Sequence, residues 1–213
     1  MKIKPFYGFL AAGLAVVALS VISILQFGTE PNTFKPDDVL SFRNVKNRLL
    51  KSQVGSPFHG NSAFDSLRYF PVSATEIFSS DFYPIRNGAL LDLMPDRPGY
   101  DSHQITGYVV IKKETWTDTL FVLKDLNEKT DTSFFIPFSD QSNGRGSYGG
   151  GRYLDVVVKK GRPVVLNFNY AYNPYCAYNA EYICARIPAI NHLSRPVEAG
   201  EKDYPESNLH ETP

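Results

Sequence analysis

Residues 104–125 read QITGYVVIKKETWTDTLFVLKD, and this stretch decides the fold class. Two runs, 104–112 and 119–125, are rich in β-branched and aromatic residues and flank a polar turn that contains Trp116. Such side chains suit a pleated, half-buried surface, whereas the turn between the runs is polar. The stretch therefore predicts a β-hairpin.

Short extended runs continue on both sides of this hairpin, at 68–72, 89–94, 132–138, 152–159 and 163–169. Glycine, proline, asparagine and aspartate separate them, which is typical of close turns. We expect 152–159 and 163–169 to pair with each other around Gly161, which can adopt a positive φ. No alternation of strands with helices is visible. The pattern predicts a mostly β fold, either an antiparallel sandwich or a partly closed barrel.

One amphipathic helix is predicted ahead of these strands, over residues 37–51. Asp37 or Asp38 can cap its start, and basic residues gather near its end, where they complement the helix dipole. Apolar residues recur three to four positions apart and form one packing face. That face consists of Val39, Phe42, Val45 or Lys46, and Leu49.

Residues 1–28 predict a single transmembrane helix before the β domain. The run 6–27 is 22 residues long and carries no charge, so as a helix it would span about 33 Å, enough for a bilayer core. Lys2 and Lys4 flank it, and by the positive-inside rule they keep the N-terminus in the cytoplasm. A cleaved signal with a small-x-small site at 18–20 is the alternative. Both interpretations place residues 29–213 outside the cytoplasm.

The length of 213 residues suits one domain. We expect a linker at 29–36, an extracytoplasmic β-rich domain at 37–202 and a flexible tail at 203–213. The chain has 22 basic and 22 acidic residues, and without Lys2 and Lys4 the remainder carries a net charge of −2. This balance argues against nucleic acid as a partner. The oligomeric state does not follow from the sequence.

A glycine loop, NGRGSYGGGRYLD, occupies residues 143–155. Its glycines fit the spacing of a dinucleotide fingerprint, but a strand rather than a helix follows, which disfavours nucleotide binding. Two interpretations stay open. The glycines form a tight structural turn, or the amides of 149–151 approach an anion while Arg152 supplies a planar fork.

A tyrosine- and asparagine-rich stretch, residues 167–201, follows the last predicted strand. Val164, Leu166 and Phe168 alternate with Asn167 and Asn169, so we expect the apolar three inside and both asparagines outward. Tyrosine and asparagine together are typical of binding loops, because rigid rings combine with adaptable amides. The alternative is a covering loop whose tyrosines cap the core.

The chain has two cysteines, Cys176 and Cys184, both in this Tyr/Asn loop. Outside the cytoplasm such a pair favours a disulfide. A reduced pair, or a metal site with His192, is the alternative, although the spacing is wider than in structural zinc sites. We expect neither a metal nor another cofactor.

The run FIPFSDQSNGRGSYGGGRYLD, followed by VVLNFNYAYNPYCAYNAEYICARIPAINHL and VEAGEK, resembles a family of bacterial and archaeal proteins known as domain of unknown function 1684. The upstream pieces SPFHG and FDSLRYFPV are similar too, so the resemblance runs over about residues 42–202. It implies no activity, but it directs attention to the glycine loop and the Tyr/Asn loop.

The favoured interpretation is a membrane-tethered binding module that holds a small polar or anionic ligand between these two loops. Its partners would be the membrane, through residues 6–27, and that ligand. An alternative is a structural or envelope-interaction protein without a ligand. Another is an enzyme that uses Asp140, Asp155 or Glu201 with Arg152. The candidate ligand-binding residues are Asp140, Tyr148, Gly149, Gly150, Arg152, Asn169, Tyr172, Asn173 and Tyr178.

Overall fold

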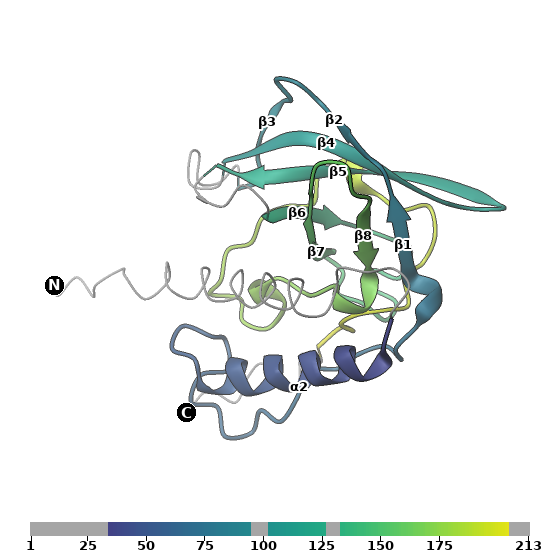
Figure 1. Cartoon of the computed structure of the whole chain (residues 1–213). Helices are drawn as coiled ribbons and strands as arrows, with labels where there is room; N and C mark the ends of the chain where they lie inside the picture. Colours follow the sequence, from purple (N-terminus) through teal and green to yellow (C-terminus); the bar gives the residue numbers. More distant parts are fainter. Residues whose placement is uncertain (1–33, 95–101, 127–132, 205–213) are drawn as a thin grey trace, which may run out of the picture.

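A computed structural model describes residues 34–94, 102–126 and 133–204 of the chain (Figure 1). The predicted anchor at 6–27 lies outside these residues, as do most of the linker and most of the tail. Among the described residues, no helix combines the length and the apolar character needed to cross a bilayer.

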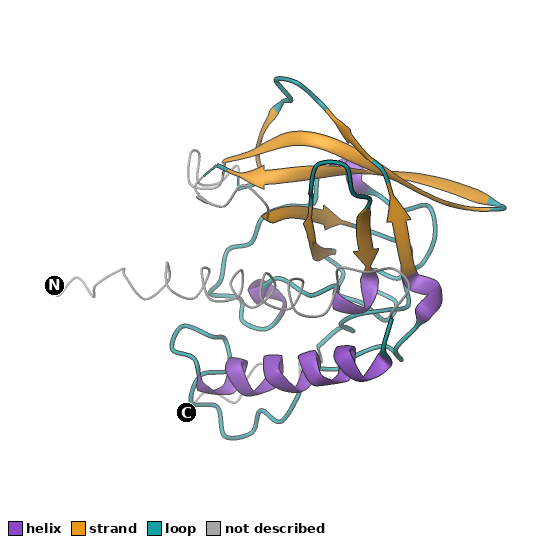
Figure 2. Ribbon diagram, viewed as in Figure 1, coloured by secondary structure: helices purple, strands orange, loops and turns teal. Residues whose placement is uncertain are grey.

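Antiparallel strands and one α-helix make up the described chain (Figure 2). The helix α2 spans Pro36–Ser52. The strands are β1 (Ile77–Ser80), β2 (Phe82–Pro84), β3 (Leu90–Asp92), β4 (Ser102–Lys113), β5 (Trp116–Asp125), β6 (Ser133–Phe138), β7 (Arg152–Val157) and β8 (Val164–Asn167). Short 3-10 turns stand at Ala74–Glu76, Phe168–Tyr170, Tyr175–Ala177 and Ala189–Asn191. The predicted mostly β, antiparallel class with one helix is confirmed.

The strands form two sheets. The larger has the order β2-β4-β5-β6-β7, with β3 also paired to β4, and the smaller joins β1 to β8. The long hairpin β4–β5 is the one predicted from residues 104–125, with Val109 opposite Leu120. In the described part of the chain the ladder ends at β2 and β7, so the strands form no closed barrel.

The pairing predicted between 152–159 and 163–169 is wrong. β7 pairs with β6, where Leu154 faces Ile136, and β8 pairs with β1, where Leu166 faces Phe78. Gly161 does adopt a positive φ of 72° in the connection, as expected. The turn therefore forms, but its two strands belong to different sheets.

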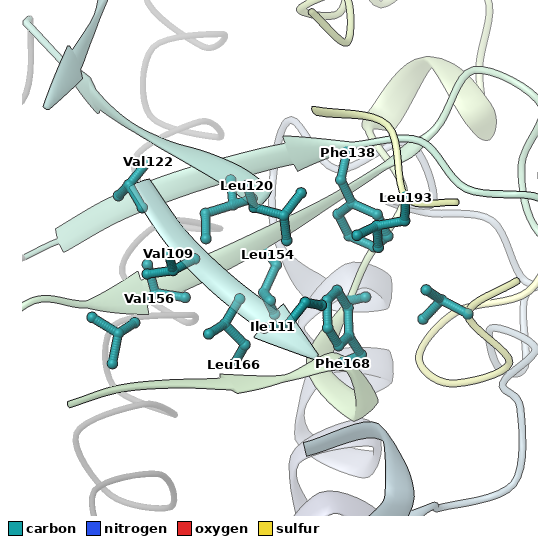
Figure 3. Close-up of a cluster of buried hydrophobic side chains, with 14 of the residues drawn as sticks. Val109, Ile111, Leu120, Val122, Phe138, Leu154, Val156, Leu166, Phe168 and Leu193 are labelled. Carbon is teal, nitrogen blue, oxygen red and sulfur yellow. The ribbon is translucent and has the colours of Figure 1, made fainter. Parts of the chain in front are cut away.

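A common apolar core lies between the two sheets (Figure 3). Val109 of β4, Val122 of β5 and Leu154 of β7 meet Leu166 and Phe168 from the β8 side. All of these side chains are buried, because successive residues of a strand point to opposite faces and these share the inner one. The predicted inward alternation of residues 164, 166 and 168 is confirmed.

The helix α2 lies across the side of the molecule away from the sheets, with loops between (Figure 1). It begins at Pro36, whose fixed φ suits the first turn. Lys35 occupies the N-cap position and makes no side-chain cap bond, so the predicted cap by Asp37 or Asp38 is wrong. Both aspartates instead lie in the first turn, where carboxylates complement the helix dipole.

The inner face of α2 is partly charged. Its buried residues are Val39, Phe42, Arg43, Lys46 and Leu50. Of the two residues considered for the middle of this face, Val45 is therefore exposed and Lys46 is buried. A second apolar cluster joins the end of α2 to the Tyr/Asn loop through Leu50, Phe58, Phe64 and Tyr178.

Candidate functional site

The glycine loop turns sharply because several of its residues adopt conformations that favour glycine. Gly144, Gly146 and Gly151 have φ values of 72°, 144° and 88°. At Gly151 a Cβ would also lie 2.5 Å from Ile187 Cγ1 and 2.8 Å from the Phe138 carbonyl oxygen. Gly149 and Gly150 are exposed at the surface of the loop. The interpretation of a tight structural turn therefore has direct support.

Arg152, which follows this turn, points into the interior and is fully buried. Its Nη2 donates to Asp140 Oδ2 at 2.9 Å and to the Val197 carbonyl at 2.7 Å. Its Nη1 donates to the carbonyls of Ala199 at 2.5 Å and Glu201 at 3.2 Å. Both amino groups are thus engaged by the protein itself. Arg152 ties the glycine loop to residues 197–201 as an internal brace.

Asp140 completes this brace. Its Oδ1 accepts the backbone N–H groups of Ser142 at 2.7 Å and Val197 at 3.0 Å, while its Oδ2 faces Arg152. Burial lowers the pKa of Arg152 from its ordinary value, and the charge of Asp140 opposes that change. The guanidinium and the carboxylate form an ion pair of 2.9 Å without exposure to solvent.

Asn169 lies apart from the other candidate residues. It was expected to point outward, but its side chain is buried. Its Oδ1 accepts the Ser73 N–H at 2.8 Å, and its Nδ2 donates to the Ser73 carbonyl at 2.7 Å. This two-point contact pins the segment before β1 onto the end of β8. The predicted alternation holds through Phe168 and fails at Asn169. The reason is that β8 ends at Asn167 and the chain enters a 3-10 turn at Phe168.

Three of the predicted residues, Tyr172, Asn173 and Tyr178, gather around one buried carboxylate. Glu201 Oε2 accepts the Asn173 N–H at 2.8 Å and the Tyr178 hydroxyl. Glu201 Oε1 lies 2.6 Å from Lys46 Nζ, and both side chains are almost completely buried. Lys46 Nζ also lies 4.6 Å from the centre of the Tyr172 ring. The structure therefore assembles a charged cluster where α2 meets the Tyr/Asn loop.

The phenol groups of this cluster are held in their neutral form. Burial raises the pKa of Tyr178 and of Tyr172 well above 10, and the neighbouring carboxylates of Glu201 and Asp155 add to the rise. Burial and Glu201 raise the pKa of Tyr69 in the same direction, while Arg43 opposes them. Neutral phenols are hydrogen-bond donors, which suits the Tyr172 bond to Asp155 Oδ1 at 3.1 Å.

Several polar atoms beside Glu201 lack hydrogen-bond partners among the described residues. They are the Tyr69 hydroxyl, Asn173 Oδ1, and Nε and Nη2 of Arg43, all buried. Tyr69 forms an isolated β-bridge with Glu201, and the Arg43 guanidinium lies 4.5 Å from the centre of the Tyr69 ring. Most buried polar groups in proteins have a hydrogen-bond partner, so a local group of atoms without one is a candidate ligand-binding site.

Arg43, Lys46 and Tyr69 are functional candidates that sequence reasoning did not identify. Lys46 did fall on the apolar face predicted for the helix, and a basic residue on such a face is a signal of a buried charge. Arg43, one turn earlier, gave no such signal. Tyr69 was placed in a strand at 68–72, of which only its bridge to Glu201 is present.

The disulfide predicted between Cys176 and Cys184 is present. It closes the part of the Tyr/Asn loop that contains Tyr178. The Tyr148 hydroxyl lies 4.0 Å from Cys176 Sγ, so this candidate residue contacts the disulfide rather than Arg152. Covalent closure of the loop favours the position of Tyr178 against Glu201.

Comparison with known proteins agrees with this fold. Residues 62–202 match the model of a family described as protein of unknown function, DUF1684. The chain belongs to this family. The family match begins after α2, the helix that carries Arg43 and Lys46.

The DUF1684 domain also has a structural relative in the solution NMR structure of an uncharacterized protein of Haloarcula marismortui. The two are 23% identical with a TM-score of 0.62, and the match covers 78% of this chain and 92% of the other. This likeness supports the fold alone. No curated protein matches the sequence.

Proposed function

We propose that the protein is a membrane-tethered, extracytoplasmic module that binds a small polar ligand beneath α2, beside Glu201. The observation that carries the proposal is the group of buried, unpartnered polar atoms of Tyr69, Asn173 and Arg43 around one carboxylate. Leaving each such atom unpaired costs about 1–3 kcal/mol, so a ligand that pairs them gains that energy on binding. The sequence predicts a ligand between the glycine loop and the Tyr/Asn loop. The unpartnered atoms lie instead where the Tyr/Asn loop meets α2.

The tether rests on residues 1–28, with their uncharged run at 6–27 and the preceding lysines. The N-terminal mass of the purified protein and its extraction from membranes test this part. A retained Met1 and extraction by detergent, but not by alkaline carbonate, support the anchor. A chain that begins just after residue 20 and appears in the soluble fraction supports a cleaved signal instead.

The ligand is tested by comparing the mass of the full chain under native and denaturing conditions, with the variants Tyr69→Phe and Tyr83→Phe. Tyr69→Phe removes the unpartnered hydroxyl, whereas Tyr83 is exposed and serves as the matched control. We expect a small molecule on wild type and Tyr83→Phe that is reduced or lost on Tyr69→Phe. If all three proteins carry no such mass, and no added small molecule stabilises them, the binding function is wrong.

An envelope-interaction protein without a ligand is the second candidate. The internal contacts of Arg152 favour it, because both amino groups of the residue expected to bind an anion donate to the protein itself. The enzyme alternative has less support. Of the carboxylates considered for it, Asp140 pairs with Arg152, Asp155 accepts from Tyr172, and Glu201 pairs with Lys46.

A further inference from the structure

The charges under α2 do not balance, and this imbalance defines the ligand more closely. Arg43 and Lys46 lie three residues apart on the inner face of the helix, and each is only 7% exposed. Glu201 is the carboxylate they face, and Lys46 pairs with it. The structure places no carboxylate of the described residues within ion-pairing distance of Arg43. Among the described residues, these two buried positive charges therefore share one carboxylate, which attracts Arg43 from beyond ion-pairing distance.

The guanidinium of Arg43 also presents its donors in a specific arrangement. Nη1 donates to the Phe70 carbonyl at 2.9 Å, which fixes one side of the group. Nε and Nη2, the edge on the other side, are buried without partners in the described chain. These two N–H groups are parallel and match the two oxygens of a carboxylate. The unused part of Arg43 is thus a complete bidentate fork.

Two other arginines, the fully buried Arg152 and the half-buried Arg195, show why Arg43 is different. The Nε and Nη2 of Arg195 are unpartnered too, but its Nη1 contacts both oxygens of Glu76, at 3.0 and 2.8 Å, so its charge is neutralised. Arg152 pairs with Asp140 and fills both of its amino groups. Of these three, Arg43 alone combines a free fork with an unbalanced charge.

We infer that the ligand is a small molecule that bears a carboxylate, bound side-on by Nε and Nη2 of Arg43 under α2. This inference rests on the proposed binding function and adds the class of ligand. The carboxylate neutralises the spare charge, while Lys46 stays paired with Glu201. A hydroxyl group on the same molecule would donate to Asn173 Oδ1, which can only accept. A hydroxycarboxylate therefore satisfies more of the cluster than a simple carboxylate does.

The experiment titrates the full chain with acetate, lactate, inorganic phosphate and sulfate at constant ionic strength, and follows the melting temperature and the heat of binding. The variants are Arg43→Gln, which removes the charge, and Arg43→Lys, which keeps the charge but loses the fork. Arg48→Gln is the matched control, since Arg48 is exposed on the same helix.

We expect lactate to bind more tightly than acetate, and both more tightly than phosphate or sulfate. Both Arg43 variants should weaken carboxylate binding at least tenfold, and Arg48→Gln should leave it unchanged. Equal carboxylate affinity of wild type and Arg43→Gln overturns the inference. Where Arg43→Gln does not fold, as judged by circular dichroism, Arg43→Lys replaces it, and unchanged affinity in that variant overturns the inference equally.

Failure of this inference can be distinguished from failure of the proposed function. Arg43-dependent binding of phosphate or sulfate, without carboxylate binding, contradicts the ligand class and leaves the binding module in place. A co-purified molecule that depends on Tyr69 but has no carboxylate does the same. If no anion binds and no molecule co-purifies, both are wrong.

Discussion

Replacing Arg152 with methionine should destabilise the domain strongly, because the side chain is an internal brace. The substitution keeps much of the apolar volume but removes the ion pair to Asp140 and the bonds to three carbonyls. Breaking a buried ion pair from one side costs about 3–5 kcal/mol, since the other charge remains buried and unpaired. Small domains are stable by about 5–15 kcal/mol in total, so the loss is a large part of the whole.

Urea unfolding at neutral pH, followed by circular dichroism and fluorescence, measures this effect. Arg145→Met is the control, because Arg145 lies in the same glycine loop and is exposed. Its cost should stay within about 0.5 kcal/mol, as for most surface substitutions. In a double-mutant cycle, Asp140→Asn combined with Arg152→Met should cost less than the sum of the single changes, because the two side chains are direct partners.

A loss below about 1 kcal/mol in Arg152→Met would refute this reasoning. It would mean that the contacts of Arg152 are not worth more than those of an exposed residue. Arg152 would then regain the ligand-binding role that its sequence context suggests. Additive single changes at Asp140 and Arg152 would also count against a direct pair.

Three further predictions concern the loops and the tyrosines. Reduction of the disulfide, or the double change Cys176→Ser with Cys184→Ser, should lower the unfolding free energy by about 2–3 kcal/mol in chemical denaturation, because the closed loop restricts the unfolded chain. Gly144→Ala should lower the free energy of unfolding by about 1–2 kcal/mol, because its φ is positive. Gly151→Ala should lower it clearly more, because the new Cβ also clashes with Ile187 and the Phe138 carbonyl. Thermal and urea unfolding of the two variants measure the difference. The folded chain holds the Tyr178 and Tyr172 protons more tightly than the unfolded chain does, so stability should be constant up to a pH of about 10 and fall above it, and Tyr178→Phe should show a shallower fall in the same titration.

The sequence predicts those parts of the fold that depend on local pattern. The hairpin around residues 104–125 follows from β-branched runs and a polar turn, and α2 follows from its apolar spacing. The disulfide follows from two cysteines and the expected compartment. The partners of β7 and β8 do not follow, because β6 and β1 select them through the shared core. Pairing between distant strands depends on the whole core rather than on the connecting turn.

The candidate site was predicted only in part, for a related reason. Tyr172, Asn173 and Tyr178 do converge, but on Glu201 and Lys46 rather than on Arg152. Whether a basic side chain is buried depends on the elements that pack over it, and periodicity does not report this. Helical spacing therefore indicates Lys46 but not Arg43, whose burial depends on the packing of α2 against the rest of the chain.

A crystal structure of the full chain with lactate tests the central claim most directly. The account predicts a carboxylate under α2, with its two oxygens about 2.7–2.9 Å from Nε and Nη2 of Arg43. It also predicts that Lys46 remains paired with Glu201. Lactate bound elsewhere would contradict the account. So would Nε and Nη2 of Arg43 hydrogen-bonded to acceptors of the protein itself at saturating lactate.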